Sequence, residues 1–183
     1  MAYKYGLQNA VVEATKSFDR HIDSNVPRIA LIDYANREDT DTLKVADALG
    51  NKLNAVRVDT CGENVMQGGT LGKLEYWDGN GVTILGVDSL NRVLRDVNRE
   101  DVKVILTSGF GDVSKVEAFA YAEKYLGRKL FDGLGVGGIF ESRMATMDVV
   151  AIGDERDHMI PMSKVGRVYR PNPNLELRLG CGK

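Results

Sequence analysis

Apolar residues follow two alternating spacings along the first 147 residues. Steps of three and four, typical of amphipathic helices, are found at 7–22, about 40–49, 87–97 and 114–126. Short apolar runs, typical of strands, are found at 28–32, 55–58, 102–106 and 131–134. Uninterrupted runs such as 28–32 predict strands that are buried on both faces. Strands that alternate with helices imply right-handed crossovers and a parallel sheet, either open or closed into a barrel.

The alternation ends after residue 147. Residues 148–152 are strand-like, whereas 160–162 and 166–169 have the pattern of short antiparallel pieces. We therefore predict an α/β region over 1–147, followed by a C-terminal β appendage and tail over 148–183.

Composition narrows the class of protein. A chain of 183 residues with 43% apolar residues is long enough for one well-packed core. The net charge is -2 and no run carries one sign, which disfavours a nucleic-acid partner. No apolar stretch approaches the ~20 residues of a membrane span, and the first residues lack a signal-peptide pattern. We expect a cytoplasmic protein without a membrane partner, in which Cys61 and Cys181 are reduced thiols.

Polar and glycine residues collect directly after the four predicted strands. Asp33 follows the first strand, Arg57 and Asp59 end the second, and glycine-rich turns at 108–112 and 135–138 follow the third and fourth. The carboxyl ends of parallel strands open on one edge of a sheet, where α/β folds place their binding sites. These residues are therefore the candidate site.

The residue types at this edge predict a composite ligand. Glycine turns that lead toward helices present backbone N–H donors to an anion, typically phosphate. Carboxylates suit sugar hydroxyls or a magnesium ion carried by a polyphosphate. Arg57 suits a carboxylate or an aromatic ring. Phosphate, ribose and a ring acid together meet these demands.

Simpler interpretations stay open for single residues. Asp33 could cap the following helix, Asp59 and Arg57 could form an exposed ion pair, and Cys61 could be a buried thiol. Gly133, Gly135 and Gly138 also match the GxGxxG pattern of dinucleotide-binding proteins, with Asp154 as the acidic residue. That fingerprint normally opens its fold, whereas here it follows four strand–helix units, which disfavours this alternative.

Several motifs in the same order resemble one known family. They are VEATKSFD at 12–19, ALID at 30–33, VRVDT at 56–60, GNGVTI at 79–84, TSGFG at 107–111 and LGVGG at 134–138. In order and spacing the chain resembles the nicotinate phosphoribosyltransferases, which belong to the type II phosphoribosyltransferases together with the nicotinamide and quinolinate enzymes. The resemblance runs from about Val12 to Tyr169.

The resemblance implies an irregular α/β barrel, of which this chain would be a part. It also implies transfer of phosphoribosyl from phosphoribosyl pyrophosphate to nicotinate in NAD biosynthesis, with Mg²⁺ and in some members ATP. Asp59 and Asp33 would be catalytic, facing the ribose and magnesium pyrophosphate, and Arg57 would lie against the pyridine ring. The 5′-phosphate would be bound by Ser108, Gly109, Gly111, Gly135, Gly137 and Gly138.

The chain also departs from this family. Its members are longer, and the histidine phosphorylated during ATP use has no counterpart in residues 1–4. A split enzyme, a truncated one and a degenerate, non-catalytic phosphosugar-binding or scaffolding half-domain are all compatible with the sequence. An open barrel leaves edges uncovered, so we expect a homo-oligomer or an N-terminal partner. The acceptor stays open between nicotinate, nicotinamide and quinolinate, although Arg57 favours an acid.

Overall fold

Four parallel strands form the main sheet of the computed structural model, which describes residues 1–137, 147–153 and 158–167. The sheet order is β1-β2-β3-β4, which is also the order along the chain. The bounds are Arg28–Leu31 for β1, Leu53–Val58 for β2, Lys103–Leu106 for β3 and Gly133–Leu134 for β4. The parallel α/β architecture predicted from the sequence is confirmed.

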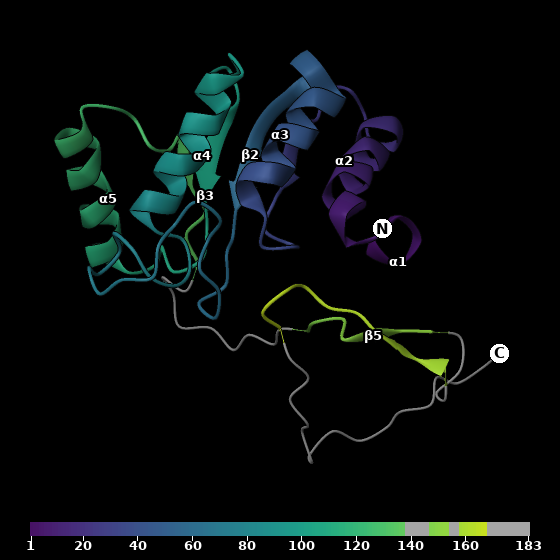
Figure 1. The fold of residues 1–183 in the computed structure, drawn as a ribbon. Helices are drawn as coiled ribbons and strands as arrows, with labels where there is room; N and C mark the ends of the chain where they lie inside the picture. The colour runs from purple at the N-terminus through teal and green to yellow at the C-terminus, as the bar shows by residue number, and fades with distance from the viewer. Residues whose placement is uncertain (138–146, 154–157, 168–183) are drawn as a thin grey trace.

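Helices connect these strands (Figure 1). They are α1 (Ala2–Tyr5), η1 (Leu7–Asn9), α2 (Ala10–His21), α3 (Glu38–Leu49), η2 (Gly50–Lys52), α4 (Ile84–Asp96) and α5 (Val113–Leu126). Thr83 caps α4 by accepting from the Gly86 N–H, and Gly127 ends α5 in a left-handed conformation, as its position predicts. The α3 helix begins at Glu38 after Arg37, without a side-chain cap.

The two faces of the main sheet differ in their surroundings. Ala30, Val56 and Val104 are at most 1% exposed, and they alternate with residues on the opposite face. On that opposite face, Ile29 and Leu31 are 45% and 43% exposed. The prediction that this run is buried on both faces is therefore wrong. Right-handed crossovers that advance in one direction through the sheet place all their helices on the same face, so the other face stays open.

The strand order and the one-sided helices are features that α/β barrels share. In an α/β barrel, consecutive strands are neighbours and the helices form an outer layer. Here β1 and β4 are the two edges of the main sheet, and barrel closure is not observed among the described residues.

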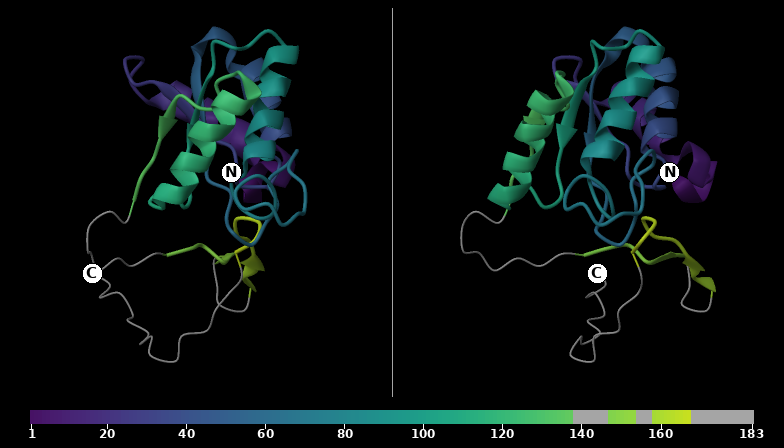
Figure 2. Two further views of the ribbon diagram at one scale, coloured as in Figure 1. Left: turned by 90° about the vertical axis from the view of Figure 1, so that its left-hand side faces the viewer. Right: turned by 60° about the vertical axis from the view of Figure 1, so that its left-hand side comes forward.

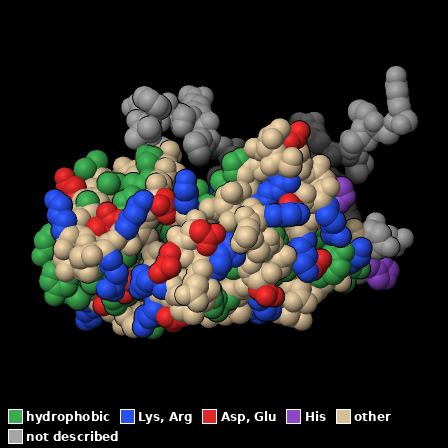
Figure 3. Space-filling view, turned by 90° about the horizontal axis from the view of Figure 1, so that it is seen from above, with side chains coloured by type: hydrophobic (Ala, Val, Ile, Leu, Met, Phe, Trp, Pro, Cys, Tyr) green, Lys and Arg blue, Asp and Glu red, His purple; other side chains and the backbone are tan. Residues whose placement is uncertain are grey.

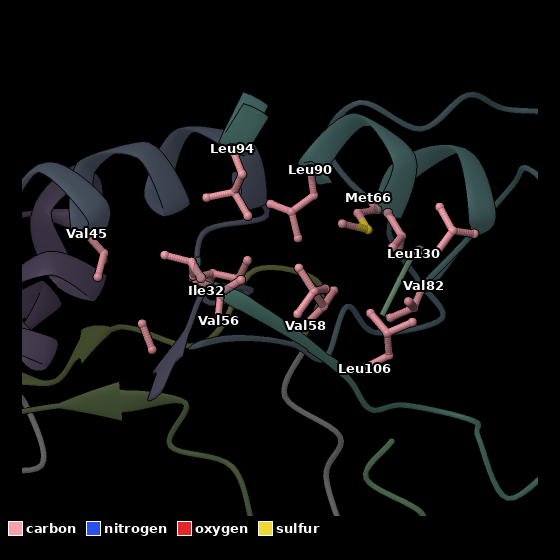
Figure 4. Packing of buried hydrophobic residues seen from close by; sticks show 14 of the residues in the cluster. Ile32, Val45, Val56, Val58, Met66, Val82, Leu90, Leu94, Leu106 and Leu130 are labelled. Carbon is pink, nitrogen blue, oxygen red and sulfur yellow. The ribbon is translucent and has the colours of Figure 1, made fainter. Parts of the chain in front are cut away.

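The core lies between the sheet and its helices (Figure 4). Ile32, Val56, Val58 and Leu106 extend from the strands toward the layer that contains Leu90 and other buried residues of α4. This packing fixes the positions of the strand ends.

A second, antiparallel sheet consists of β5 (Ala151–Ile152) and β6 (Ile160–Pro161). It lies beyond the carboxyl ends of the main strands in the views of Figures 1 and 2. The antiparallel pairing of β5 with β6 agrees with the pattern predicted for 148–152 and 160–162, while the predicted boundary between 147 and 148 stays a prediction.

On the face shown in Figure 3, basic and acidic side chains are interspersed. Within the described part of the chain, no helix has the length and apolar character needed to cross a membrane.

Candidate functional site

The carboxyl ends of all four main strands lie along one edge of the sheet. Leu31 pairs with Arg57, Val58 with Leu106, and Leu106 with Leu134. Arg57 lies within β2, and the turns that follow the strands contain the other predicted site residues that the structure describes. Parallel pairing therefore brings together residues that lie more than 100 positions apart in the sequence.

An acid cluster, which we define as Asp33, Glu38, Asp59 and the Lys164 ammonium, occupies the ends of β1 and β2. Lys164 Nζ donates to Asp33 Oδ2, and it also donates to the Asp59 backbone oxygen at a distance of 2.9 Å. Asp33 is only 2% exposed, and its Oδ1 has no hydrogen-bond partner among the described residues. The structure thus places both predicted catalytic acids together, with a lysine between them.

Burial and charge act on Asp33 in opposite directions. Removal from water raises the pKa of the Asp33 carboxyl, while the hydrogen bond and charge of Lys164 lower it; the nearby Asp59 charge raises it again. Burial prevails, so the pKa lies above its ordinary value. The side chain of Asp33 does not cap α3, so the simpler interpretation of this residue does not hold.

Glu38 supports the cluster from the first turn of α3. It is fully buried and accepts hydrogen bonds from Thr60 Oγ1 at 2.7 Å and from the Gln67 N–H at 2.9 Å. Burial raises the pKa of this carboxyl above its usual range. These bonds also fix the loop after β2 against α3.

Lys164 is a site residue that sequence reasoning missed. It lies 131 positions from Asp33, in the segment predicted to be an appendage. The next residue, Val165, holds the segment in place through two hydrogen bonds of 3.0 Å. Its N–H donates to the backbone oxygen of Tyr34, and its carbonyl oxygen accepts from Asn64 Nδ2. Cys61, the buried thiol expected from the sequence, also donates to this carbonyl at 3.7 Å. No sequence spacing could have indicated these contacts.

Arg57 lies on the open face of the sheet, between Leu31 and Ile105 on the neighbouring strands. Its Nη2 is 3.9 Å from Asp59 Oδ2, and both side chains are more than a third exposed. Such a pair contributes little to stability. Arg57 Nε is buried and lacks a hydrogen-bond partner among the described residues, so the guanidinium has unused donor capacity.

The glycine turns, residues 108–111 and 135–137, follow β3 and β4. Ser108 and Gly109 have φ values of 71° and 82°, a conformation that favours glycine. A Cβ on Gly111 would lie 2.6 Å from the Gly137 oxygen, so the two turns touch. A Cβ on Gly135 would lie 2.3 Å from Thr107 Cγ2. Gly138, the last residue predicted for this group, lies outside the described residues.

Lys115, from the first turn of α5, lies beside the first glycine turn. Its Nζ donates to the Ser108 oxygen at 3.0 Å and lies 4.6 Å from the centre of the Phe110 ring. Burial lowers the pKa of this ammonium to about 8. Lys115 was not among the residues predicted from the sequence, although a cation in the first turn of a helix after a glycine turn was an available signal.

A cavity of about 480 Å³ lies next to the acid cluster. Leu31, Tyr34, Val11 and Met162 contribute to its mostly apolar wall, which also includes Lys164. A volume of this size accommodates a small aromatic molecule.

The glycine-rich loop after β2 contacts the residue that follows the first glycine turn. Tyr76 Oη donates to Asp112 Oδ2 at 2.6 Å, a bond that raises the pKa of Tyr76 to about 12. Tyr76 and Trp77 also pack against the core. This loop therefore fixes Asp112, the residue that caps α5.

The donor set limits which cation could bind. In the parts of the chain described here, no group of three or more His, Cys, Asp or Glu side chains forms a metal site. Mg²⁺ nevertheless needs only one or two carboxylates when substrate phosphates and water complete its coordination. The unpartnered Asp33 Oδ1 and the partly exposed Asp59 fit that requirement.

The sheet topology argues against the dinucleotide alternative. Dinucleotide-binding sheets reverse their strand order at the binding crevice. The main sheet described here runs from β1 to β4 without reversal. The remaining parts of that alternative, Gly138 and Asp154, fall outside the described residues.

Comparison with known proteins gives one structural relationship. No protein-family model and no curated protein matches the chain. Among solved structures, the chain is similar to a nicotinate-nucleotide pyrophosphorylase from Pyrococcus furiosus, with 26% sequence identity and a TM-score of 0.54. The match covers 86% of this chain and 34% of that one. The α/β architecture is therefore similar to about a third of the pyrophosphorylase.

Proposed function

We propose that this chain carries the phosphoribosyl-binding part of a phosphoribosyltransferase that acts on a pyridine acid, with nicotinate as the first candidate, in NAD biosynthesis. The observation that carries the proposal is the convergence of the acid cluster and the glycine turns on one edge of a parallel sheet. The similarity to a nicotinate-nucleotide pyrophosphorylase supports the same class of reaction.

The proposed reaction forms a bond between the ring nitrogen and C1′ of the ribose, while the bond from C1′ to the pyrophosphate oxygen breaks. Positive charge develops on the ribose as pyrophosphate leaves with the bonding electron pair. Asp59 and Asp33 would stabilise this charge and hold the ribose hydroxyls, since fixed carboxylates in a partly dry site need little reorganisation. The 5′-phosphate would be bound by the glycine turns.

Mg²⁺ is the proposed cofactor, and it would neutralise the pyrophosphate. Asp33 and Asp59 would hold it together with the substrate. ATP coupling stays a prediction, and running the transferase assay with and without ATP tests it.

Two features suit the acceptor ring. Arg57 offers a cation on the open sheet face, and the cavity beside Leu31, Tyr34 and Lys164 offers an apolar space. Both favour an aromatic acid over a neutral amide, because each combines an apolar surface with a cation.

A non-catalytic phosphosugar-binding half-domain is the second candidate. Its supporting observation is that Lys164 already occupies Asp33, whereas the glycine turns and Lys115 offer donors to a phosphate. The exposed Ile29 and Leu31 on the open sheet face further suggest that a second copy or an N-terminal partner covers this face. Size-exclusion chromatography at several concentrations tests for a second copy, and a monomer throughout would contradict one.

The decisive experiment measures formation of the pyridine mononucleotide from phosphoribosyl pyrophosphate and Mg²⁺. Nicotinate, nicotinamide and quinolinate serve as parallel acceptors, with and without ATP. The chain is assayed alone and together with a polypeptide that supplies the amino-terminal part of a longer homologue. Turnover with one acceptor supports the transferase. Binding of ribose 5-phosphate without turnover in either form supports the half-domain instead.

A further inference from the structure

Lys115 is a buried cation that the proposed chemistry has not yet used. The residue is 9% exposed, and its ammonium forms no salt bridge with any carboxylate in the described part of the chain. A buried charge is normally paired or else destabilising. A buried ammonium at a strand end therefore suits a site that receives an anion from outside.

The surroundings of Lys115 define what this anion would contact. Its Nζ hydrogen-bonds the Ser108 oxygen, and a Cβ on Gly109 would lie only 3.5 Å from Nζ. The ammonium carries three hydrogens, of which the Ser108 bond takes one and the Phe110 ring faces another. Donor capacity therefore remains on the side of the first glycine turn.

One ionisable neighbour opposes an anion here. Asp112 caps α5 through the Ser114 N–H and accepts from Tyr76 Oη, and its charge raises the pKa of Lys115. Burial nevertheless outweighs Asp112, so the ammonium keeps a lowered pKa of about 8. The hydrogen bonds from Tyr76 and Ser114 partly neutralise the Asp112 carboxylate, which reduces its repulsion of a bound anion.

We propose that Lys115 is the charged partner of a phosphate monoester bound at the first glycine turn. The inference deepens the proposed function, because it names the residue that would neutralise the 5′-phosphate. It rests on that function only for the identity of the natural ligand.

The sign of the pH effect follows from charge. A bound phosphate dianion favours the ammonium and raises its pKa, so the complex binds more protons than the free chain near pH 8. Affinity should consequently fall as the pH rises from 7 to 9.5, because the free lysine then loses its proton. Arginine remains charged over this range and should remove the dependence.

The test is isothermal titration of the chain with ribose 5-phosphate at pH 7, 8 and 9.5, in two buffers of different ionisation enthalpy. We compare the wild type with Lys115→Met, Lys115→Arg and the matched control Lys124→Met, an exposed lysine on the same helix. Thermal melting of each variant confirms that it is folded.

We expect Lys115→Met to bind about 10- to 100-fold more weakly at pH 7, as for loss of a charged hydrogen bond. We expect Lys115→Arg to bind without the alkaline decline, and Lys124→Met to behave as the wild type. Two results would overturn the inference. One is an affinity for ribose 5-phosphate that is the same in Lys115→Met as in the wild type, and the other is a wild-type affinity that does not change between pH 7 and 9.5. Absence of transferase turnover with these binding results intact would contradict only the proposed function.

Discussion

The acid cluster and the glycine turns lie on the same sheet edge, yet they are stabilised in different ways. In the acid cluster, the buried carboxylate of Asp33 is paired with the Lys164 ammonium of the same chain. At the glycine turns, backbone atoms approach closely and Lys115 has no carboxylate partner among the described residues. A buried ion pair within the chain contributes to stability as well as to chemistry, whereas a cation without a salt bridge is suited to a ligand. Substitutions should therefore affect the two regions differently.

The largest effect should come from Asp59→Ala in the acid cluster. The side chain is partly exposed and its ion pair with Arg57 is long, so we expect little loss of stability. We expect turnover in the transferase assay to fall by about 100- to 1000-fold, as for loss of one electrostatic group in a reaction centre. A large drop in melting temperature with activity preserved would instead show a structural role.

Lys164→Met tests whether the acid cluster is balanced by this residue. The substitution leaves the buried Asp33 without its cation, so we expect a loss of about 3 kcal/mol in the free energy of unfolding. Denaturant titration measures this loss. The control Lys52→Met removes an exposed cation from Asp19 and should cost less than about 1 kcal/mol. Equal losses of stability in Lys164→Met and Lys52→Met would contradict the stabilising role of the Lys164–Asp33 pair.

Gly135→Ala tests close packing in the glycine turns. The new Cβ would collide with Thr107 Cγ2, so we expect a loss of about 1–3 kcal/mol in stability. Gly137→Ala is the matched control in the same turn, because no atom lies within 4 Å of its added Cβ. That variant should stay within about 0.5 kcal/mol of the wild type. If Gly135→Ala and Gly137→Ala have the same stability, the turns are less tightly packed than the structure indicates.

Glu38→Gln should have the smallest effect, seen in the pH dependence of stability. Burial raises the folded-state pKa of Glu38, so the folded chain binds more protons than the unfolded chain above the ordinary pKa of about 4.3. Its contribution to stability is therefore present at low pH and lost as the pH rises through the folded pKa. Denaturant titrations from pH 4 to 8 should show a shallower decline in Glu38→Gln. If the free energy of unfolding declines with pH equally in the wild type and in Glu38→Gln, the pH dependence comes from other groups.

Local sequence patterns predicted much of this fold. The spacing of apolar residues indicated the strands and the helices that connect them. The order of strands and helices also placed Asp33, Asp59 and the glycine turns on one edge, because parallel strands share a direction. These features depend on residues that are neighbours in the sequence or on the handedness of crossovers.

Tertiary structure alone decided the electrostatic state of the site. Asp33 meets Lys164 across 131 positions, and the burial of Glu38 and Lys115 depends on how α3 and α5 pack against the sheet. The exposure of Ile29 and Leu31 likewise depends on all helices lying on one face. Charge balance and burial are properties of contacts between distant segments, so no local spacing of residues encodes them. The sequence by itself determined where the candidate groups stand, and only the folded chain determined which of them are paired.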